Sequence, residues 1–317
     1  MLLLLAGQNT ERRDNTLRLS ILALGHGLAD KVSEIPDLII FFDWKKSHEP
    51  ILRKAKALKI PAILLKFEPH VVIKDHLNPK IDSKFARVIE VGRANSATPV
   101  FWPQNWNLKY FDNNERFDRA VAVSGNKFSF MRGELYSLRA SVYGVVDSLD
   151  VFGTGWGNSR INNLLKLLKE FQLALTSSSL SMSFACINSS RIRPLNLMGP
   201  VHNKLEAISR YKVSLVIENT LGYMTEKLLD SIFAGTIPVY VGPQVEIFGI
   251  PKNLVVTAEP SVGAISRALI QAGEIDHEDW KEQAREWMNR PGVKESWNLQ
   301  GAVESLLKLA EGEIESQ

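Results

Sequence analysis

Short apolar runs alternate with segments of helical periodicity along most of the chain. Runs of β-branched and aliphatic residues are typical of strands buried in a parallel sheet, and apolar residues three and four apart indicate the helices between them. The strands predicted in this way cover 2–6, 37–42, 61–67, 86–91, 120–124, 150–153, 180–184, 211–217 and 237–241. The predicted helices cover 48–58, 135–149, 162–174, 203–209 and 225–234, and the chain is helical from 262 onward. This alternation predicts an α/β fold with parallel sheets.

The segment 93–118 interrupts the alternation. It contains Pro99, Pro103 and several asparagines, and it has no clear period. A chain of 317 residues fits about two domains, so we expect this segment to carry the crossover between two Rossmann-like halves. We predict a first domain at 1–119 and a second at 120–317 that includes the C-terminal helices.

Residues 211–242 combine a buried strand, a polar turn, a helix and a second buried strand. Ligands of open α/β sheets bind beyond the carboxyl ends of the strands, so the turn at 218–223 is the predicted place for chemistry. Glu226 complements the positive end of the helix dipole. Its position fits an acid that stabilises the helix as well as a residue that binds a ligand. Lys227 opposes the dipole, and this placement favours a bound anion.

Two carboxylates follow predicted strands of the first domain. Glu68 comes directly before Pro69 at the end of the strand 61–67, and Asp43 follows the strand 37–42. Both should lie at the carboxyl edge of the sheet, which makes both candidates for a general base. Surface glutamates are common at strand ends, so position alone assigns the role to neither.

The residues of the polar turn resemble the donor-site signature of glycosyltransferase family 10, the α-1,3/1,4-fucosyltransferases. The signature reads here as Glu-Asn-Thr at 218–220, a Leu-Gly spacer at 221–222 and Tyr-Met-Thr-Glu-Lys at 223–227, followed by AGTIPVYVG. The spacer is shorter than in many members. Upstream segments at 126–127, 133–139, 151–156 and 199–204 are also similar to the family, so the likeness covers roughly 36–256.

The resemblance implies a GT-B arrangement of two Rossmann-like domains that face each other across a cleft, with acceptor binding in 1–119 and donor binding in 120–317. It implies an inverting fucosyltransferase that moves L-fucose from GDP-β-L-fucose to a hydroxyl of an oligosaccharide or glycoconjugate acceptor, in α-1,3 or α-1,4 linkage. The family places its proposed general base at the position of Glu68. The implied donor-site residues are Asn126, Lys127, Arg139, Asn219, Tyr223, Glu226 and Lys227.

The resemblance also implies roles for these residues. Arg139 and Lys227 would offset the charge on the leaving diphosphate, and Glu226 would accept hydrogen bonds from the ribose hydroxyls. Asn219 and Tyr223 would line the donor turn.

Composition narrows the class of protein and its location. The net charge of +3 is too small to indicate a nucleic-acid partner. No apolar run approaches the length of a membrane span, and the opening MLLLLAG lacks the features of a signal peptide. Cys186 is the only cysteine, which excludes an intramolecular disulfide and favours a reducing compartment. We expect a cytoplasmic protein similar to the bacterial members of the family.

We expect neither a metal nor a cofactor. No Asp-x-Asp triplet occurs, and His70 and His76 have no third ligand nearby, so we interpret both as surface residues. Protein cations must then offset the diphosphate charge. The basic stretch from Lys45 to Lys59 predicts a solvated helix face, and the alternative is contact with an anionic membrane at its inner surface.

Two other functions stay open. An enzyme of the same build could use another GDP-sugar, because the residues assigned to the nucleotide would be shared. A catalytically silent nucleotide-sugar binding module could retain the donor site, with Glu68 having no role as a base.

Overall fold

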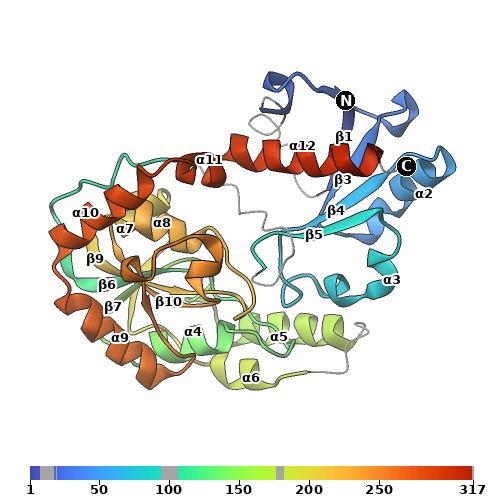
Figure 1. Cartoon of the computed structure of the whole chain (residues 1–317). Coiled ribbons are helices and arrows are strands. Elements are labelled where there is room, and N and C mark those ends of the chain that lie inside the picture. Colours follow the sequence, from blue (N-terminus) through green and yellow to red (C-terminus); the bar gives the residue numbers. More distant parts are fainter. Residues whose placement is uncertain (8–17, 19, 94–105, 176–181, 316–317) are drawn as a thin grey trace. The chain divides into compact units, whose positions relative to one another are not determined.

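The computed structural model describes residues 1–7, 18, 20–93, 106–175 and 182–315, and these form two compact units, each with its own parallel sheet (Figure 1). The first unit consists of Met1–Asn105 together with Glu295–Gln317, and the second consists of Trp106–Lys294. The division differs from the expected one: it falls at 105/106 rather than 119/120, and the end of the chain belongs to the first unit.

The first unit is a five-stranded sheet of order β2-β1-β3-β4-β5 in which every strand pair is parallel. Its strands are β1 (Leu2–Gly7), β2 (Gly27–Ala29), β3 (Leu38–Phe42), β4 (Ala62–Lys66) and β5 (Arg87–Glu90). Its helices are α2 (Glu49–Ala57), α3 (Pro79–Asp82) and α12 (Leu299–Glu315), and α11 (Val293–Trp297) contains the boundary between the units. Among the described residues of this unit, three 3₁₀ helices cover Val32–Glu34, Lys46–His48 and Lys74–Leu77.

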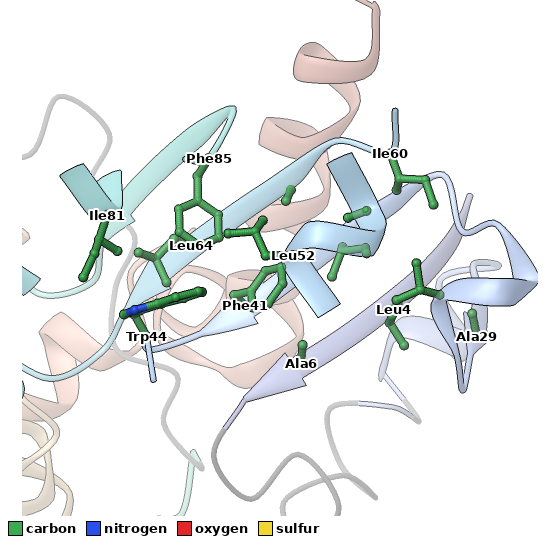
Figure 2. Packing of buried hydrophobic residues seen from close by; sticks show 14 residues of the cluster. Leu4, Ala6, Ala29, Phe41, Trp44, Leu52, Ile60, Leu64, Ile81 and Phe85 are labelled. Carbon is green, nitrogen blue, oxygen red and sulfur yellow. The ribbon is translucent and has the colours of Figure 1, made fainter. Parts of the chain in front are cut away.

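Alternate residues of these strands build two hydrophobic layers, because successive side chains of a strand point to opposite faces. On one face, Phe41 and Leu64 pack with Leu52 of α2 and with Trp44 (Figure 2). On the other face, Ile40 and Ile63 pack with residues of α12, namely Val303, Leu306 and Leu307. The apolar side of α12 therefore completes the first core, which explains why the C-terminal helix is not part of the second unit.

The second unit is a six-stranded sheet of order β11-β10-β9-β6-β7-β8, again parallel throughout. Its strands are β6 (Phe117–Val123), β7 (Leu149–Phe152), β8 (Asn196–Gly199), β9 (Tyr211–Ile217), β10 (Ile237–Val241) and β11 (Val256–Thr257). Its helices are α4 (Tyr136–Tyr143), α5 (Arg160–Leu175), α6 (Ala185–Ser189), α7 (Lys204–Ile208), α8 (Lys227–Phe233), α9 (Val262–Glu274) and α10 (His277–Met288), with 3₁₀ helices at Val245–Phe248 and Lys252–Leu254.

The strand order reverses between β6 and β9. From β6 the chain continues through α4 to β7 on one side, and from β9 it continues through α8 to β10 on the other side. Right-handed crossovers in opposite directions place α4 and α8 on opposite faces of the sheet. In agreement, α4 packs with α9, whereas α8 packs with α7. The carboxyl ends of β6 and β9 therefore border the crevice in which doubly wound sheets bind ligands.

Two predicted elements differ from the structure. The helix predicted at 135–149 ends at Tyr143, where Gly144 lies against Ile192 so closely that a Cβ would be 2.4 Å from that side chain. The strand predicted at 180–184 lies partly outside the described residues, and Met182 forms only an isolated bridge with Met131 before α6 begins. The strand β8 comes later in the chain, at the edge of the sheet.

Candidate functional site

The carboxyl ends of β6 and β7 are tied together in the second unit. The backbone N–H of Asn126 donates to the Thr154 carbonyl at 2.9 Å, and its side-chain amide donates to the Gly155 carbonyl at 3.1 Å. Gly153 has a φ of +147°, and a Cβ there would lie 2.0 Å from the Ser124 carbonyl oxygen. Asn126 is buried by these contacts, whereas its neighbour Lys127 is exposed.

Arg139 of α4 holds the carboxyl end of β9. Its side chain is 3% exposed, and its Nε donates to the Ile217 carbonyl at 2.9 Å. Its Nη2 donates to the same carbonyl and to Asn219 Oδ1, the latter at 2.9 Å. Two residues that sequence reasoning assigned to the donor site are thus in direct contact, and the guanidinium charge lies beside the turn that follows β9.

Glu218 is a functional candidate to which sequence reasoning gave no role. It is the first residue after β9, and it is 0% exposed. Its carboxylate accepts hydrogen bonds from Thr225 N at 2.9 Å and from Thr225 Oγ1 at 2.7 Å. Burial raises the pKa of Tyr240, whose hydroxyl lies 3.4 Å from Glu218, and the carboxylate raises it further. The available signal was an acidic residue directly after an apolar strand, at the carboxyl edge of the sheet where ligands of such folds bind.

Lys227 begins α8, and its ammonium group faces Glu218. Its Nζ donates to Thr225 Oγ1 at 2.7 Å and lies 3.4 Å from Glu218 Oε2, and its side chain is 19% exposed. Lys227, in the first turn of the helix, therefore has structural partners in Glu218 and Thr225. Its position does not require a bound anion. Tyr223 is buried in the same turn.

Glu226 is held by the lysine of a neighbouring helix. Lys204 of α7 lies 3.6 Å from Glu226 Oε1 and also pairs with Asp230. Burial acts to raise the pKa of Glu226, but the charges of Lys227 and Lys204 outweigh it, so the pKa is lowered and the carboxylate is ionised. Burial likewise acts to lower the pKa of Lys204, but Asp230 and Glu226 outweigh it, so its pKa is raised. Sequence reasoning did not assign Lys204 to the site.

A small cavity of about 20 Å³ lies among these groups, next to the point where the strand order reverses. Ser124, Lys204, Ser214 and Lys227 contribute to its lining. The Ser214 hydroxyl is buried and has no hydrogen-bond partner among the described residues. A cavity of this size with polar walls has room for about one water molecule.

The candidate base lies in the first unit, after β4. Glu68 is half-buried, and its backbone N–H donates to Asp43 Oδ1 at 3.2 Å. Asp43 follows β3 with a φ of +55°, is 6% exposed, and accepts a second hydrogen bond from Phe67 N at 2.8 Å. The rival base suggested by the sequence is therefore a buried acceptor of backbone hydrogen bonds.

His76 is buried, so the prediction that it lies on the surface was wrong. It is 6% exposed in the 3₁₀ helix Lys74–Leu77, and its Nδ1 donates to the Glu68 carbonyl at 2.7 Å. Burial lowers its pKa to about 4, so the ring is neutral near pH 7 and Asp43, 3.6 Å away, faces an uncharged imidazole. His70, by contrast, is partly exposed.

The structure also bears on metals and membranes. Within the described ranges, no group of three or more His, Cys, Asp or Glu side chains is arranged to hold a metal ion. None of the helices in those ranges combines the length and apolar character that crossing a membrane requires. The basic side chains Arg53, Lys54 and Lys56 of α2 are exposed, whereas Leu52 and Ala55 of the same helix are buried.

Comparison with known proteins gives a consistent fold and short sequence matches. No family model matches the chain. An α-(1,3)-fucosyltransferase of Helicobacter pylori is 48% identical over 58 residues, which are 17% of this chain and 12% of that protein. A putative fucosyltransferase-like protein of Arabidopsis thaliana is 54% identical over 43 residues, or 13% of this chain and 8% of that protein.

Solved structures match along nearly the whole chain. The alignment with the crystal structure of an α-1,3-fucosyltransferase covers 99% of this chain and 90% of the chain in that structure, with 15% identity and a TM-score of 0.53. The alignment with the Anabaena protein HepE, solved with UDP and glucose, covers 98% of this chain and 99% of the HepE chain, with 9% identity and a TM-score of 0.61. At these identities the likeness is one of fold. The chain therefore has the two-unit α/β fold of GT-B glycosyltransferases, and in short segments its sequence is similar to that of fucosyltransferases.

Proposed function

We propose that the protein is an inverting fucosyltransferase that uses GDP-β-L-fucose as its donor and an oligosaccharide or glycoconjugate hydroxyl as its acceptor. The observation that carries the proposal is the cluster at the carboxyl end of β9, where Arg139, Asn219 and Lys227 surround the signature turn. This cluster lies where the strand order reverses, which is the ligand-binding edge of a doubly wound sheet. The matched fucosyltransferase segments support the choice of sugar.

The second unit supplies the donor site in this proposal. Lys227 and Arg139 would stabilise the charge that grows on the diphosphate as the bond to the anomeric carbon breaks. Glu226 is ionised and partly exposed, so its carboxylate would accept hydrogen bonds from the ribose hydroxyls. These hydrogen bonds would partly replace its ion pair with Lys204. The turns around the sugar and phosphates would be shaped by Asn126, Asn219 and Tyr223. Lys127 is exposed and would contact the donor at the solvent side of the site.

The first unit supplies the acceptor site and the base in this proposal. Glu68 would take the proton of the acceptor hydroxyl while that oxygen forms a bond to the anomeric carbon and GDP leaves with the electrons of the broken bond. A single displacement converts the β-linked donor into an α-linked fucoside. Asp43 is less suited to this role, because its carboxylate is buried and already accepts two backbone hydrogen bonds.

Release of GDP from a panel of GDP-sugars, with and without mixed oligosaccharide acceptors, tests the proposal. Acceptor-dependent release from GDP-fucose, with an α-linked product, would support it. Release from a different GDP-sugar would change the donor while preserving the assignment of the nucleotide contacts. Tight binding of GDP-fucose without turnover on any acceptor would instead indicate a binding module.

A further inference from the structure

The main chain on both sides of Glu68 is held by two buried side chains. Asp43 Oδ1 accepts the N–H groups of Phe67 at 2.8 Å and Glu68 at 3.2 Å. His76 Nδ1 donates to the carbonyl of Glu68 at 2.7 Å. The peptide groups that flank the Glu68 Cα are thus fixed from opposite directions, while the side chain itself is half-buried.

The two side chains are also linked to each other. His76 Nε2 accepts the backbone N–H of Trp44 at 3.4 Å, and Trp44 is the residue that follows Asp43. Three hydrogen bonds and the peptide bond between Asp43 and Trp44 therefore close a ring that joins the ends of β3 and β4 to the 3₁₀ helix. The proton on Nδ1 follows from the network, because a carbonyl oxygen can only accept.

Charged groups that face this ring keep its parts in place. Lys66 is 2% exposed, donates to the His76 carbonyl at 2.9 Å, and pairs with Asp82 at 2.8 Å and Glu90 at 3.8 Å. The backbone of His76 is therefore fixed independently of its ring. The imidazole is held in addition by its own hydrogen bonds to the Glu68 carbonyl and the Trp44 N–H.

We propose that Asp43 and His76 form a peptide clamp that positions the carboxylate of Glu68 for proton transfer. The inference rests on the proposed function, in which Glu68 is the base. Neither Asp43 nor His76 touches the reacting atoms, so both are positioning residues. Displacement of a base by about 1 Å can lower a rate by up to about 100-fold, which is the effect expected when the clamp is removed.

The histidine offers matched variants. His76→Leu removes the donor to the Glu68 carbonyl, whereas His76→Asn can keep an amide N–H near the position of Nδ1. His26 is a control histidine of the same unit, because it precedes β2 at the amino edge of the sheet, opposite the clamp. We expect roughly a 10- to 100-fold loss of kcat in His76→Leu, partial recovery in His76→Asn and no change in His26→Leu.

A double-mutant cycle separates positioning from a structural role. If the clamp acts through the Glu68 carboxylate, His76→Leu should change the residual rate of Glu68→Gln by less than about twofold. The KM for GDP-fucose should stay within about twofold in every variant, because the donor contacts lie in the second unit. Full additivity of the two substitutions, or wild-type kcat in a folded His76→Leu, would overturn the clamp.

The remaining outcomes also distinguish the two proposals. If His76→Leu fails to fold, the kcat values of His76→Asn and His76→Gln test the clamp instead. The Asn amide lies near the position of Nδ1, whereas the Gln amide lies closer to that of Nε2. Equal kcat in the two variants would overturn the clamp. If Glu68→Gln itself turns over at the wild-type rate, the assignment of the base fails and the clamp fails with it. If Glu68→Gln is inactive while the clamp variants are fully active, only the clamp is lost.

Discussion

Lys227 and Glu218 form an ion pair in the turn after β9, with Nζ 3.4 Å from Oε2 of a carboxylate that is 0% exposed. The lysine therefore compensates a buried charge as well as facing the proposed diphosphate site. A buried carboxylate depends strongly on the ammonium group paired with it, because an unpaired charge in the interior is costly. The two roles of Lys227 predict two separable effects of its removal.

Lys227→Ala should lower GDP affinity at least about tenfold and reduce the free energy of unfolding by about 1–3 kcal/mol. The first effect reflects a lost charge-assisted contact and the second an uncompensated Glu218. Calorimetric GDP binding and thermal unfolding measure them. Lys212→Ala, which breaks an exposed pair with Asp118, should leave both nearly unchanged.

The double variant Glu218→Gln with Lys227→Met tests whether the effects are independent. Removing both charges should restore much of the stability, because neither partner is left unpaired. GDP affinity should remain low. Recovery of GDP affinity together with stability would mean that Lys227 has only a structural role.

Glu68→Gln keeps the shape of the side chain but removes its ability to accept a proton. Transfer should fall by about 100- to 10,000-fold while GDP-fucose binds with near wild-type affinity. Product formation and equilibrium binding, measured on the same preparation, provide the test. Glu34→Gln, at an exposed carboxylate of the same unit, serves as the control. Unchanged transfer in Glu68→Gln would move the base elsewhere.

Stability should fall as the pH is lowered from about 6.5 towards 4, in part because of His76. Burial lowers the pKa of this histidine to about 4 in the folded protein, and the unfolded value is about 6.5. Between these values the unfolded chain binds the additional proton, so acid favours unfolding. The contribution is at most about 3 kcal/mol.

Denaturant unfolding at several pH values, compared between wild type and His76→Asn, isolates this contribution. The comparison is needed because burial also lowers the pKa values of His48 and His277. The variant should lose less stability on acidification than the wild type. Parallel pH curves for the two proteins would show that His76 does not titrate as a buried neutral group.

Activity should persist in excess EDTA. The proposal offsets the diphosphate charge with Arg139 and Lys227, and the sequence contains no Asp-x-Asp triplet. Added divalent ions should give at most a modest increase through pairing with released GDP. Complete loss on chelation, with recovery by one particular metal, would contradict the assignment.

Gly153→Ala should destabilise the second unit and impair donor binding. A Cβ at this position would lie 2.0 Å from the Ser124 carbonyl oxygen, and the φ of +147° disfavours other residues. The ends of β6 and β7 would have to separate, at a cost on the order of 1–3 kcal/mol. Gly157→Ala is a suitable control, since nothing lies within 4 Å of a Cβ there.

Local pattern was sufficient to predict the elements that hold the candidate donor site. The strands β9 and β10 have the bounds expected from their apolar runs, because both faces of these central strands are buried. The edge strand β8 was missed, since its four residues Asn-Leu-Met-Gly have no such signal. The family resemblance assigned Arg139 and Asn219 to the same site, but no local pattern predicted the hydrogen bond between them.

Long-range contacts account for what the sequence did not predict. His76 stands in a polar stretch, and its burial arises only because the 3₁₀ helix lies against the ends of β3 and β4. The same holds for Lys204, which reaches Glu226 from a different helix. Periodicity reports the local face of an element, but it does not report which distant element covers that face.

The packing of α12 has a consequence for synthesis of the chain. Ile40 and Ile63 belong to the earliest part of the sequence, yet Val303 and Leu306, which cover them, are translated only after the entire second unit (Figure 1). Until then one face of the first sheet presents uncovered aliphatic side chains. The core of the first unit can therefore be completed only after the residues of the second unit have been translated.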